Sequence, residues 1–444
     1  MAVASAIVIA NMIGAGVFTG AGFQAASLHD PMTMLLTWVV GGVLALCGAA
    51  CYAELGSMMP RAGGEYVYLR EAYHPAVGFM SGWVSLTAGF SAPIAAAALL
   101  FAAYLAKVVP ALEGSLTGKL VATGLIVAVT ALHAFDTRLG GRVQTGFTIA
   151  KVLLIVVFIV AGLLFGTGDW SHLATQGEGL GQLATSHGAA EFATSLMYVS
   201  FAYSGWNAAA YIAGEIKDPQ RTLPRALLLG TGVVMGLYIL LNIVFLYATA
   251  PTRMAGVKEV GDLAANDLFG ESAGRLLSTL IALALVSSVS AMLMAGPRVY
   301  AAMAADRALP RPLAYYSKRG VPSIAVVTQA VLAIVFVFIA DLGELIEFVG
   351  FTLALFAALT VGAVFVFRRR ARFDATVPTP AYRTIGYPIT PILFIGLSVW
   401  IVYLRVSEHP RQSGFVGLLL LVGAAIYLLT NKGKVTHTPI ETDE

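Results

Sequence analysis

Twelve long segments of this chain are almost free of charged residues, and no other feature limits its fold so strongly. A helix that crosses a bilayer needs about 20 mainly apolar residues. In lipid, every backbone polar group must be paired within the structure, which helices achieve internally. The sequence therefore predicts an all-α integral membrane protein with twelve transmembrane helices. We place them near residues 2–27, 33–57, 76–108, 119–135, 142–166, 188–213, 224–250, 272–304, 323–340, 343–368, 388–405 and 413–431.

Composition agrees with a membrane protein and disagrees with a water-soluble one. Of the 444 residues, 58% are hydrophobic and only 11% are charged, whereas soluble domains carry roughly 25% charged residues. The net charge of +3 gives no general basic field, so we predict no nucleic acid partner. The first apolar segment has neither a charged lead-in nor a convincing cleavage site, so we interpret it as a mature span that has lost its lead-in.

Lysine and arginine residues indicate the orientation, because cytoplasmic loops carry an excess of both. With twelve spans and the N-terminus inside, 18 of the 27 fall on the inner side and 7 on the outer side. We therefore expect both termini in the cytoplasm, with residues 432–444 forming a short cytoplasmic tail. The chain is expected in the plasma membrane, which in a bacterium is the inner membrane. An odd number of spans would spoil this asymmetry.

Two of the predicted spans contain residues that interrupt a helix. The first span has Gly14-Ala15-Gly16 near its middle, and the sixth has Ser204-Gly205-Trp206-Asn207. Glycine weakens a helix interior, and irregular backbone in lipid is tolerated where it is buried or lines a cavity. Such a break frees N–H groups at one half-helix and C=O groups at the other, which suit a carboxylate and an ammonium respectively. Two facing breaks would therefore bind a zwitterion.

The two breaks also indicate an internal repeat. Gly14 and Gly205 are 191 residues apart, which fits a five-span unit that occurs twice with inverted topology. We predict one transporter domain over 1–431, in which 1–166 and 188–368 are the two repeats and 388–431 adds two helices. Two other interpretations remain open for the first break. Gly16 and Gly20 form a GxxxG helix-packing motif, and Gly14-Ala15-Gly16 resembles the start of a dinucleotide fingerprint, although the third glycine is missing.

Several motifs in order resemble the amino acid–polyamine–organocation superfamily, and within it the bacterial relatives of the L-type amino acid exchangers. The likeness extends over nearly the whole chain. It is carried by Ile13-Gly14-Ala15-Gly16-Val17-Phe18, Pro60-Arg61-Ala62-Gly63-Gly64-Glu65-Tyr66, Phe201-Ala202-Tyr203-Ser204-Gly205-Trp206-Asn207, Gly214-Glu215-Ile216-Lys217-Asp218-Pro219 and Asp306-Arg307-Ala308-Leu309-Pro310.

This resemblance implies an inverted-repeat transporter that works by alternating access on an amino acid. It implies that the amides of Ile13, Gly14, Ala15 and Gly16 bind the substrate carboxylate, and that the carbonyls of Phe201, Ala202 and Ser204 bind its ammonium. Phe201 would also close the site from outside as an aromatic gate, and Asn207 would face the pocket as a polar group. The alternative for Phe201 is an ordinary packing or lipid-facing role.

Lys151 lies inside the fifth predicted span. A lysine within a membrane is costly and marks a functional site unless its ammonium reaches the interface by snorkelling. The resemblance implies that this ammonium replaces the sodium ion that sodium-coupled members hold between spans one and eight. We expect it to contact carbonyls near Ile13 and Gly14 and a serine of span eight, and we predict transport without sodium. Whether Lys151 also carries a transported proton stays open.

Acidic residues bear on the substrate. We expect Glu54, Glu65 and Asp136 at the cytoplasmic ends of spans, and Glu347 with its neighbours towards the outer ends. Because a substrate cation without a carboxylate in the pocket would be costly, neutral amino acids are favoured, through exchange or proton symport. A cationic amino acid or polyamine permease is the alternative, and Glu347 is the residue most able to support it.

Other functional classes find little support in the sequence. The seven histidines are scattered, and no Walker A, nucleophile elbow or HExxH motif occurs, so we predict neither an enzyme nor a metal or other cofactor. A channel or a nutrient sensor on the same scaffold remains an alternative that flux measurements would distinguish. The predicted partners are the amino acid substrate and membrane lipid, with protons as a candidate coupling ion. Cys47 and Cys51 lie on one span, so no disulfide-linked accessory subunit is indicated.

Overall fold

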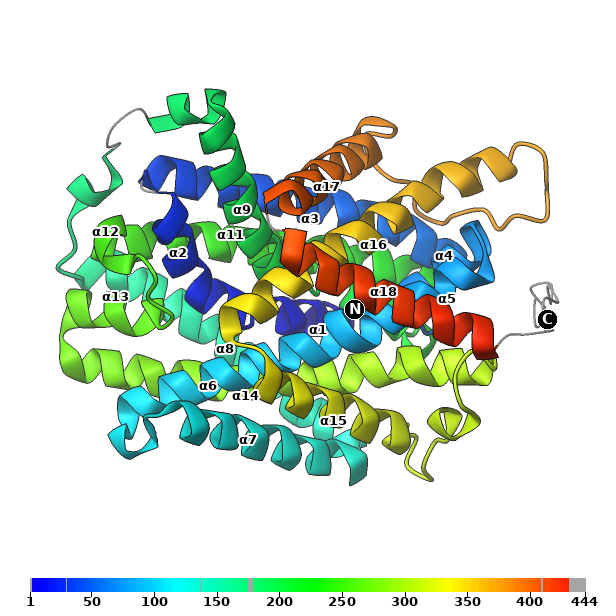
Figure 1. Cartoon of the computed structure of the whole chain (residues 1–444), viewed down its shortest axis with the longest axis horizontal. Helices are drawn as coiled ribbons and strands as arrows, with labels where there is room; N and C mark the ends of the chain where they lie inside the picture. Colours follow the sequence, from blue (N-terminus) through cyan, green and yellow to red (C-terminus); the bar gives the residue numbers. More distant parts are fainter. Residues whose placement is uncertain (1, 29, 136, 175–178, 409, 431–444) are drawn as a thin grey trace.

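The computed structural model describes residues 2–430 except 29, 136, 175–178 and 409, and the described part is built of helices with no strand. Nine of its helices are long and apolar enough to cross a membrane. Most of the long helices run along the longest axis of the molecule (Figure 1). The predicted all-helical membrane fold is therefore confirmed, while the exact number of spans and the inverted repeat stay predictions. The predicted tail at 432–444 lies outside the described residues.

The α-helices follow one another along the chain. Their bounds are α1 Ala2–Met12, α2 Ala15–Ser27, α3 Pro31–Met58, α4 Glu65–Ala72, α5 Pro75–Val84, α6 Ala92–Val108, α7 Ser115–Phe135, α8 Thr137–Phe165, α9 Ser186–Tyr203, α10 Ala208–Tyr211, α11 Pro219–Ala248, α12 Pro251–Met254, α13 Val260–Phe269, α14 Glu271–Ala305, α15 Ser323–Ile339, α16 Leu342–Arg370, α17 Ile389–Glu408 and α18 Pro410–Thr430.

Shorter helical turns complete the chain. The π-helical turn η1 (Ser85–Ser91) joins α5 to α6 within the third predicted span, and the 3-10 turns are η2 Pro110–Leu112, η3 Trp170–Leu173, η4 Gly179–Ala184, η5 Ala213–Glu215 and η6 Arg311–Ala314. Helix starts follow local chemistry. Asp30 caps α3 by accepting from the Thr33 amide at 2.8 Å, and Asp341 forms a capping box with Glu344 at the start of α16.

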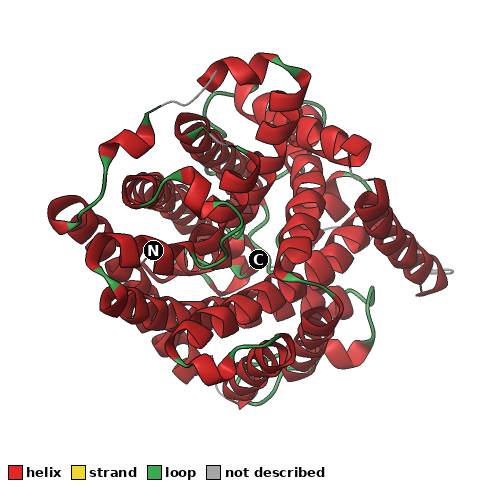
Figure 2. Ribbon diagram, turned by 60° about the vertical axis from the view of Figure 1, so that its left-hand side comes forward, coloured by secondary structure: helices red, strands yellow, loops and turns green. Residues whose placement is uncertain are grey.

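The interrupted segments lie inside the bundle. Helix α1 packs against α8, α11 and α14, and α2 packs against α9. Figure 2 shows many of the long helices closer to end-on, gathered around the middle of the molecule. Helices α12 and α13 lie at one end of the long axis and α4 at the other (Figure 1). We refer to these as the α13 end and the α4 end.

Candidate substrate site at two interrupted helices

The first interruption separates α1 from α2. The Ile13 amide still donates to the Ile9 carbonyl at 2.9 Å, after which Gly14 takes an extended conformation and becomes the N-cap of α2. No side chain caps this helix start, and Ala15 and Gly16 are buried. The first amides of an α-helix have no partner within the helix, and a helix N-terminus attracts anions. The first turn of α2 therefore offers buried donors suited to a carboxylate.

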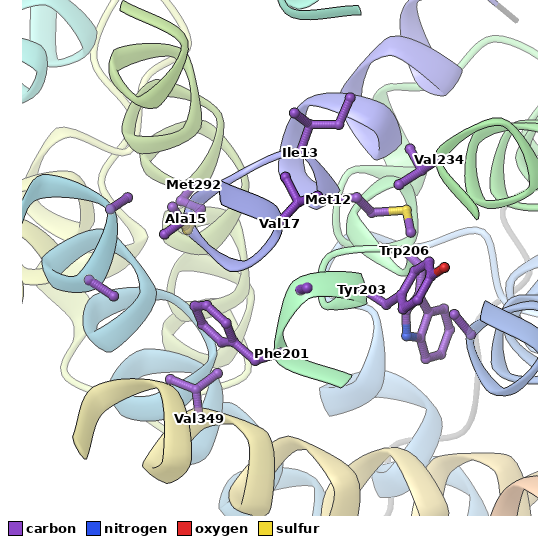
Figure 3. Packing of buried hydrophobic residues seen from close by; sticks show 14 of the residues in the cluster. Met12, Ile13, Ala15, Val17, Phe201, Tyr203, Trp206, Val234, Met292 and Val349 are labelled. Atoms are coloured by element: carbon purple, nitrogen blue, oxygen red, sulfur yellow. The ribbon is translucent and has the colours of Figure 1, made fainter. Parts of the chain in front are cut away.

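The second interruption separates α9 from α10. Helix α9 ends at Tyr203, Gly205 has φ +94°, and α10 begins at Ala208. A Cβ atom on Gly205 would lie 2.9 Å from the backbone carbon of Asn11, so both its φ and its surroundings require glycine. A Cβ atom on Gly16 would lie 2.4 Å from Cα of Ala202. The two interruptions are therefore in direct contact, as the labelled residues around them in Figure 3 illustrate.

The carbonyls at the end of α9 already have some partners. The Phe201 oxygen accepts from the Ser204 amide at 3.0 Å, and the Ala202 oxygen accepts from the Tyr238 hydroxyl at 3.2 Å. The Phe201 ring is buried, with Ala15, Met292 and Val349 labelled around it in Figure 3. Each carbonyl oxygen has a second lone pair. These groups can therefore accept a further donor such as an ammonium.

Tyr238 is a residue of this site that the sequence prediction missed. Its hydroxyl lies within hydrogen-bonding distance of the carbonyls of both Met12 and Ala202. It thus connects α11 to the end of α1 and to the end of α9 at once. The available signal was a hydroxyl in the middle of an apolar span, because a buried polar group needs a partner.

Lys151 of α8 contacts the first interruption. Its side chain is 2% exposed, and its ammonium donates to the Ile13 oxygen at 2.7 Å, the Ala10 oxygen at 3.2 Å and Ser288 Oγ at 2.8 Å. The C-terminal carbonyls of a helix carry partial negative charge. The ammonium therefore joins the end of α1 to α14, with three acceptors for its three donors.

A cavity lies beside the second interruption, between α3, the α9–α10 segment, α16 and α17. Three predicted site residues line it, namely Phe201, Ser204 and Asn207, and the rest of its wall is mostly apolar. The remaining lining residues are Gly41, Leu44, Ala45, Glu65, Ser200, Tyr203, Gly205, Trp206, Gly350, Leu353, Ala354, Ala357, Phe394, Ser398 and Ile401. The predicted residues Ile13, Gly14, Ala15, Gly16 and Ala202 are not among those described as lining it. Of the predicted site, the cavity therefore contacts residues of the second interruption but none described at the first.

Glu65 lies between two candidate membrane spans, at the start of α4, and it also reaches the interior. Its side chain lines the cavity and is 3% exposed. Gly63 and Gly64 have φ of +115° and +50° and turn the chain inward, so that α4 begins with Glu65 in the interior. The carboxylate accepts from the Tyr52 hydroxyl and from Asn207 Nδ2, the latter at 2.8 Å. Burial raises the pKa of the Glu65 carboxyl, which lies between the spanning helices α3 and α5.

Two other carboxylates are paired with arginines. Glu54 forms two hydrogen bonds with Arg368, at 2.7 and 2.8 Å. Glu347 pairs with Arg405 and also accepts from the Tyr198 hydroxyl at 3.0 Å. The charge of Glu347 is therefore paired with Arg405 of the neighbouring helix α17. Within the described residues, no group of three His, Cys, Asp or Glu side chains could hold a metal ion.

A profile described as amino acid permease matches residues 3–425 of the chain. The chain belongs to the amino acid permease family. The superfamily resemblance seen in the motifs is thus confirmed, and so is the prediction that the chain is a multi-span transporter and not an enzyme.

Individual relatives of this permease cover most of its length. The serine/threonine exchanger SteT of Bacillus subtilis is 31% identical over 434 residues, which are 97% of this chain and 96% of that protein. The b(0,+)-type amino acid transporter 1 of Mus musculus is 28% identical over 95% of this chain and 85% of its own. The human large neutral amino acids transporter small subunit 2 is 27% identical over 96% of this chain and 79% of its own.

Proposed function

We propose that this permease is a sodium-independent secondary transporter of neutral L-amino acids, working by alternating access as an exchanger or proton symporter. The observation that carries the proposal is the ammonium of Lys151 on the carbonyls of Ala10 and Ile13 and the hydroxyl of Ser288. A cation supplied by the protein at the end of α1 leaves no role there for a sodium ion. A relative at 31% identity is named as a serine/threonine exchanger, which supports neutral substrates and an exchange mechanism.

The substrate would lie across the two interruptions. The amides of residues 13–16 at the start of α2 would bind its carboxylate. The carbonyls of Phe201, Ala202 and Ser204 would bind its ammonium, and Phe201 would act as the gate. Asn207, in the wall of the neighbouring cavity, would face the substrate side chain. This arrangement uses backbone groups for the parts that all amino acids share and leaves side-chain selection to the cavity.

The architecture that we propose for this mechanism has twelve spans and both termini in the cytoplasm of a plasma-membrane protein. Residues 1–166 and 188–368 would form inverted repeats, and 388–431 two further helices within one domain over 1–431. The end of α1 at Met12 and of α9 at Tyr203 supports this repeat. The α4 end would then face the cytoplasm. The wild-type chain alone would transport, without an accessory subunit.

A cationic amino acid or polyamine permease is the second candidate. Glu65 favours it, because a carboxylate in the cavity wall could receive a substrate cation. Against it, Glu65 already accepts hydrogen bonds from Tyr52 and Asn207, and Glu347 is paired with Arg405. The named neutral substrates of two relatives also favour the first candidate.

The experiment is uptake of labelled L-serine and L-leucine into proteoliposomes that contain the purified chain alone. Vesicles are empty, preloaded with the unlabelled amino acid, or placed under a proton gradient, each with and without sodium, and lysine and spermidine are tested as competitors. Uptake driven by preload or protons and indifferent to sodium is expected. Lys151→Ala should lower it at least about tenfold, since the buried end of α1 loses a charged donor.

The matched control is Lys107→Ala, which removes an exposed lysine from the end of α6. It should transport like the parent. Uptake that requires sodium, with Lys151→Ala equal to the parent, would refute the role of Lys151. Competition by lysine or spermidine but not by neutral amino acids would replace the first candidate with the second.

A further inference from the structure

Glu65 is a deeply buried carboxylate whose hydrogen-bond donors are all neutral. Tyr52 on α3 and Asn207 at the start of α10 both donate to its Oε1 atom. Among the ion pairs of the described residues none includes Glu65, although neighbouring acids have cationic partners: Glu54 has Arg368, and Asp306 has Arg70. Burying a charge without a counter-ion is costly unless hydrogen bonds compensate or the group takes up a proton.

The carboxylate is part of a clasp on the second half of the sixth span. We define the clasp as the turn Gly63–Gly64–Glu65. The Gly63 amide donates to the Tyr211 carbonyl at 3.1 Å, and a Cβ atom on Gly64 would lie 2.6 Å from the Tyr211 ring. Asn207 Nδ2 spans the contact, because it donates to Glu65 and also to the Tyr211 hydroxyl at 2.9 Å.

In the part of the chain that the structure describes, the titratable side chains that interact with Glu65 are phenols. Tyr52 faces it from α3, Tyr68 from α4 and Tyr211 from α10, and Tyr300 of α14 adjoins Tyr211. Ser81 of α5, which also interacts with Glu65, carries no charge. Phenols stay neutral near physiological pH. Glu65 is thus the titratable group of the clasp, and it lines the cavity.

We propose that Glu65 binds a proton and thereby controls the inner half of the sixth span. The ionised carboxylate holds Asn207, and with it α10, against the clasp. When a proton from the cavity binds Glu65, the neutral acid accepts weaker hydrogen bonds from Asn207 and Tyr52, and α10 is released. Glu65 is in this sense a positioning residue that acts through Asn207. The inference rests on the proposed function, because it assigns a proton step to amino acid exchange.

The pKa of Glu65 agrees with this geometry, since burial raises it from the usual glutamate range while Tyr52 and Asn207 oppose that rise. Glu65 therefore takes up its proton at a higher pH than a surface glutamate does. Removing one of the two donors should raise the protonation midpoint further.

The test is the rate of L-serine and L-leucine exchange in proteoliposomes with the same pH on both sides, varied from about pH 5 to pH 8. The parent should exchange several times faster at the acid end. Glu65→Gln should be fast and indifferent to pH, because it resembles the protonated acid. Tyr52→Phe should shift the midpoint of the parent's profile to higher pH. Glu71→Gln, which alters an acid of the same helix that pairs with Arg70, is the matched control and should keep the parent's profile.

A second measurement does not depend on transport. Infrared difference spectra of the purified parent minus Glu65→Gln should show a buried carboxylic acid band that titrates above about pH 4.3, the usual glutamate value. If Tyr52→Phe raises the pH at which this band titrates, the proton site at Glu65 is supported even when neither amino acid is exchanged. In that case only the proposed transport function fails. A Glu65→Gln profile that follows the parent's pH dependence, or a band that titrates at the usual value, overturns the proposal.

Discussion

Glu54 near the end of α3 and Glu65 at the start of α4 are both buried carboxylates, 1% and 3% exposed, yet their charges have opposite kinds of partner. Glu54 on α3 receives two hydrogen bonds from Arg368 on α16 and a third from the Thr384 amide. Within the described residues, the hydrogen bonds that Glu65 receives come from neutral donors such as Tyr52 and Asn207. The paired charge joins two long helices, whereas the charge without an arginine meets the short helix beyond an interruption.

This difference suggests a division between fixed and movable parts. A buried ion pair is hard to separate, because each partner would be left as an uncompensated charge. A carboxylate held by neutral donors can instead become neutral by binding a proton. The first arrangement suits contacts that persist through a transport cycle, and the second suits a contact that must open in every cycle.

Glu347 extends the comparison to the opposite side of the sixth span. It pairs with Arg405 of α17 and accepts from Tyr198 of α9. Tyr198 also stacks on Phe23 of α2, with ring centroids 5.1 Å apart. Helix α9 is therefore tied to a neutralised pair, while α10 is tied to a carboxylate without an arginine.

The largest loss of stability should come from removing Arg368, the partner of Glu54. Arg368→Ala leaves Glu54 buried without a cation, which typically costs about 3–5 kcal/mol of folding free energy. The measurement is the unfolding midpoint of the detergent-purified protein, followed by tryptophan fluorescence. Arg369→Ala, a change at the exposed neighbouring arginine, is the control and should leave the midpoint unchanged. The comparison fails if Arg368→Ala is as stable as this control.

A somewhat smaller loss is expected for Glu347→Gln. Arg405 is 5% exposed and would lose its carboxylate, but Glu347 is 19% exposed, so water can partly replace it. We expect a cost of about 2–3 kcal/mol in the same unfolding assay. Glu344→Gln is the control, because glutamine still completes the capping box with Asp341. If Glu347→Gln instead behaves like Glu65→Gln, being tolerated while it alters the pH profile, then pairing with arginine does not distinguish fixed from movable contacts.

The sequence predicted the helical membrane fold and the two interruptions, but neither the pairing of Glu54 nor the neutral surroundings of Glu65. Long apolar segments made the helices foreseeable, and Gly14 and Gly205 marked where α1 and α9 end. The contact of Lys151 with Ser288 was foreseeable as well, because a lysine inside a span must find acceptors and the family resemblance indicated where.

What the sequence did not reveal depends on how distant segments meet. Glu65 was expected at the end of a span, but its inward direction depends on the positive φ of Gly63 and Gly64. Tyr238 lies far along the chain from Met12, and its hydrogen bond forms only after α11 packs against α1. The pairing of Glu54 with Arg368 joins residues 314 positions apart. No local pattern records such contacts, because they are properties of the packed bundle.

The smallest expected effect concerns the dependence of stability on pH. Burial raises the pKa of Glu65 in the folded protein, so between its unfolded and folded values the native state binds more protons than the unfolded state. Its contribution to stability is then fully present below the unfolded value and is lost as the pH rises through the folded value. Glu65→Gln cannot lose a proton. The unfolding temperature of the parent should therefore match that of Glu65→Gln in acid and fall below it by a few degrees towards about pH 8.

The measurement is the difference in unfolding temperature between the parent and Glu65→Gln, taken at each pH in detergent. Titration of groups that do not interact with Glu65 affects both proteins equally and drops out of this difference. The half-buried Glu71 on the same helix provides the control, and the curve for Glu71→Gln should follow the parent throughout. A constant offset between parent and Glu65→Gln would mean that Glu65 keeps its charge over the whole range. Glu65 would then be a structural acid like Glu54, held by stronger hydrogen bonds than its neutral donors suggest.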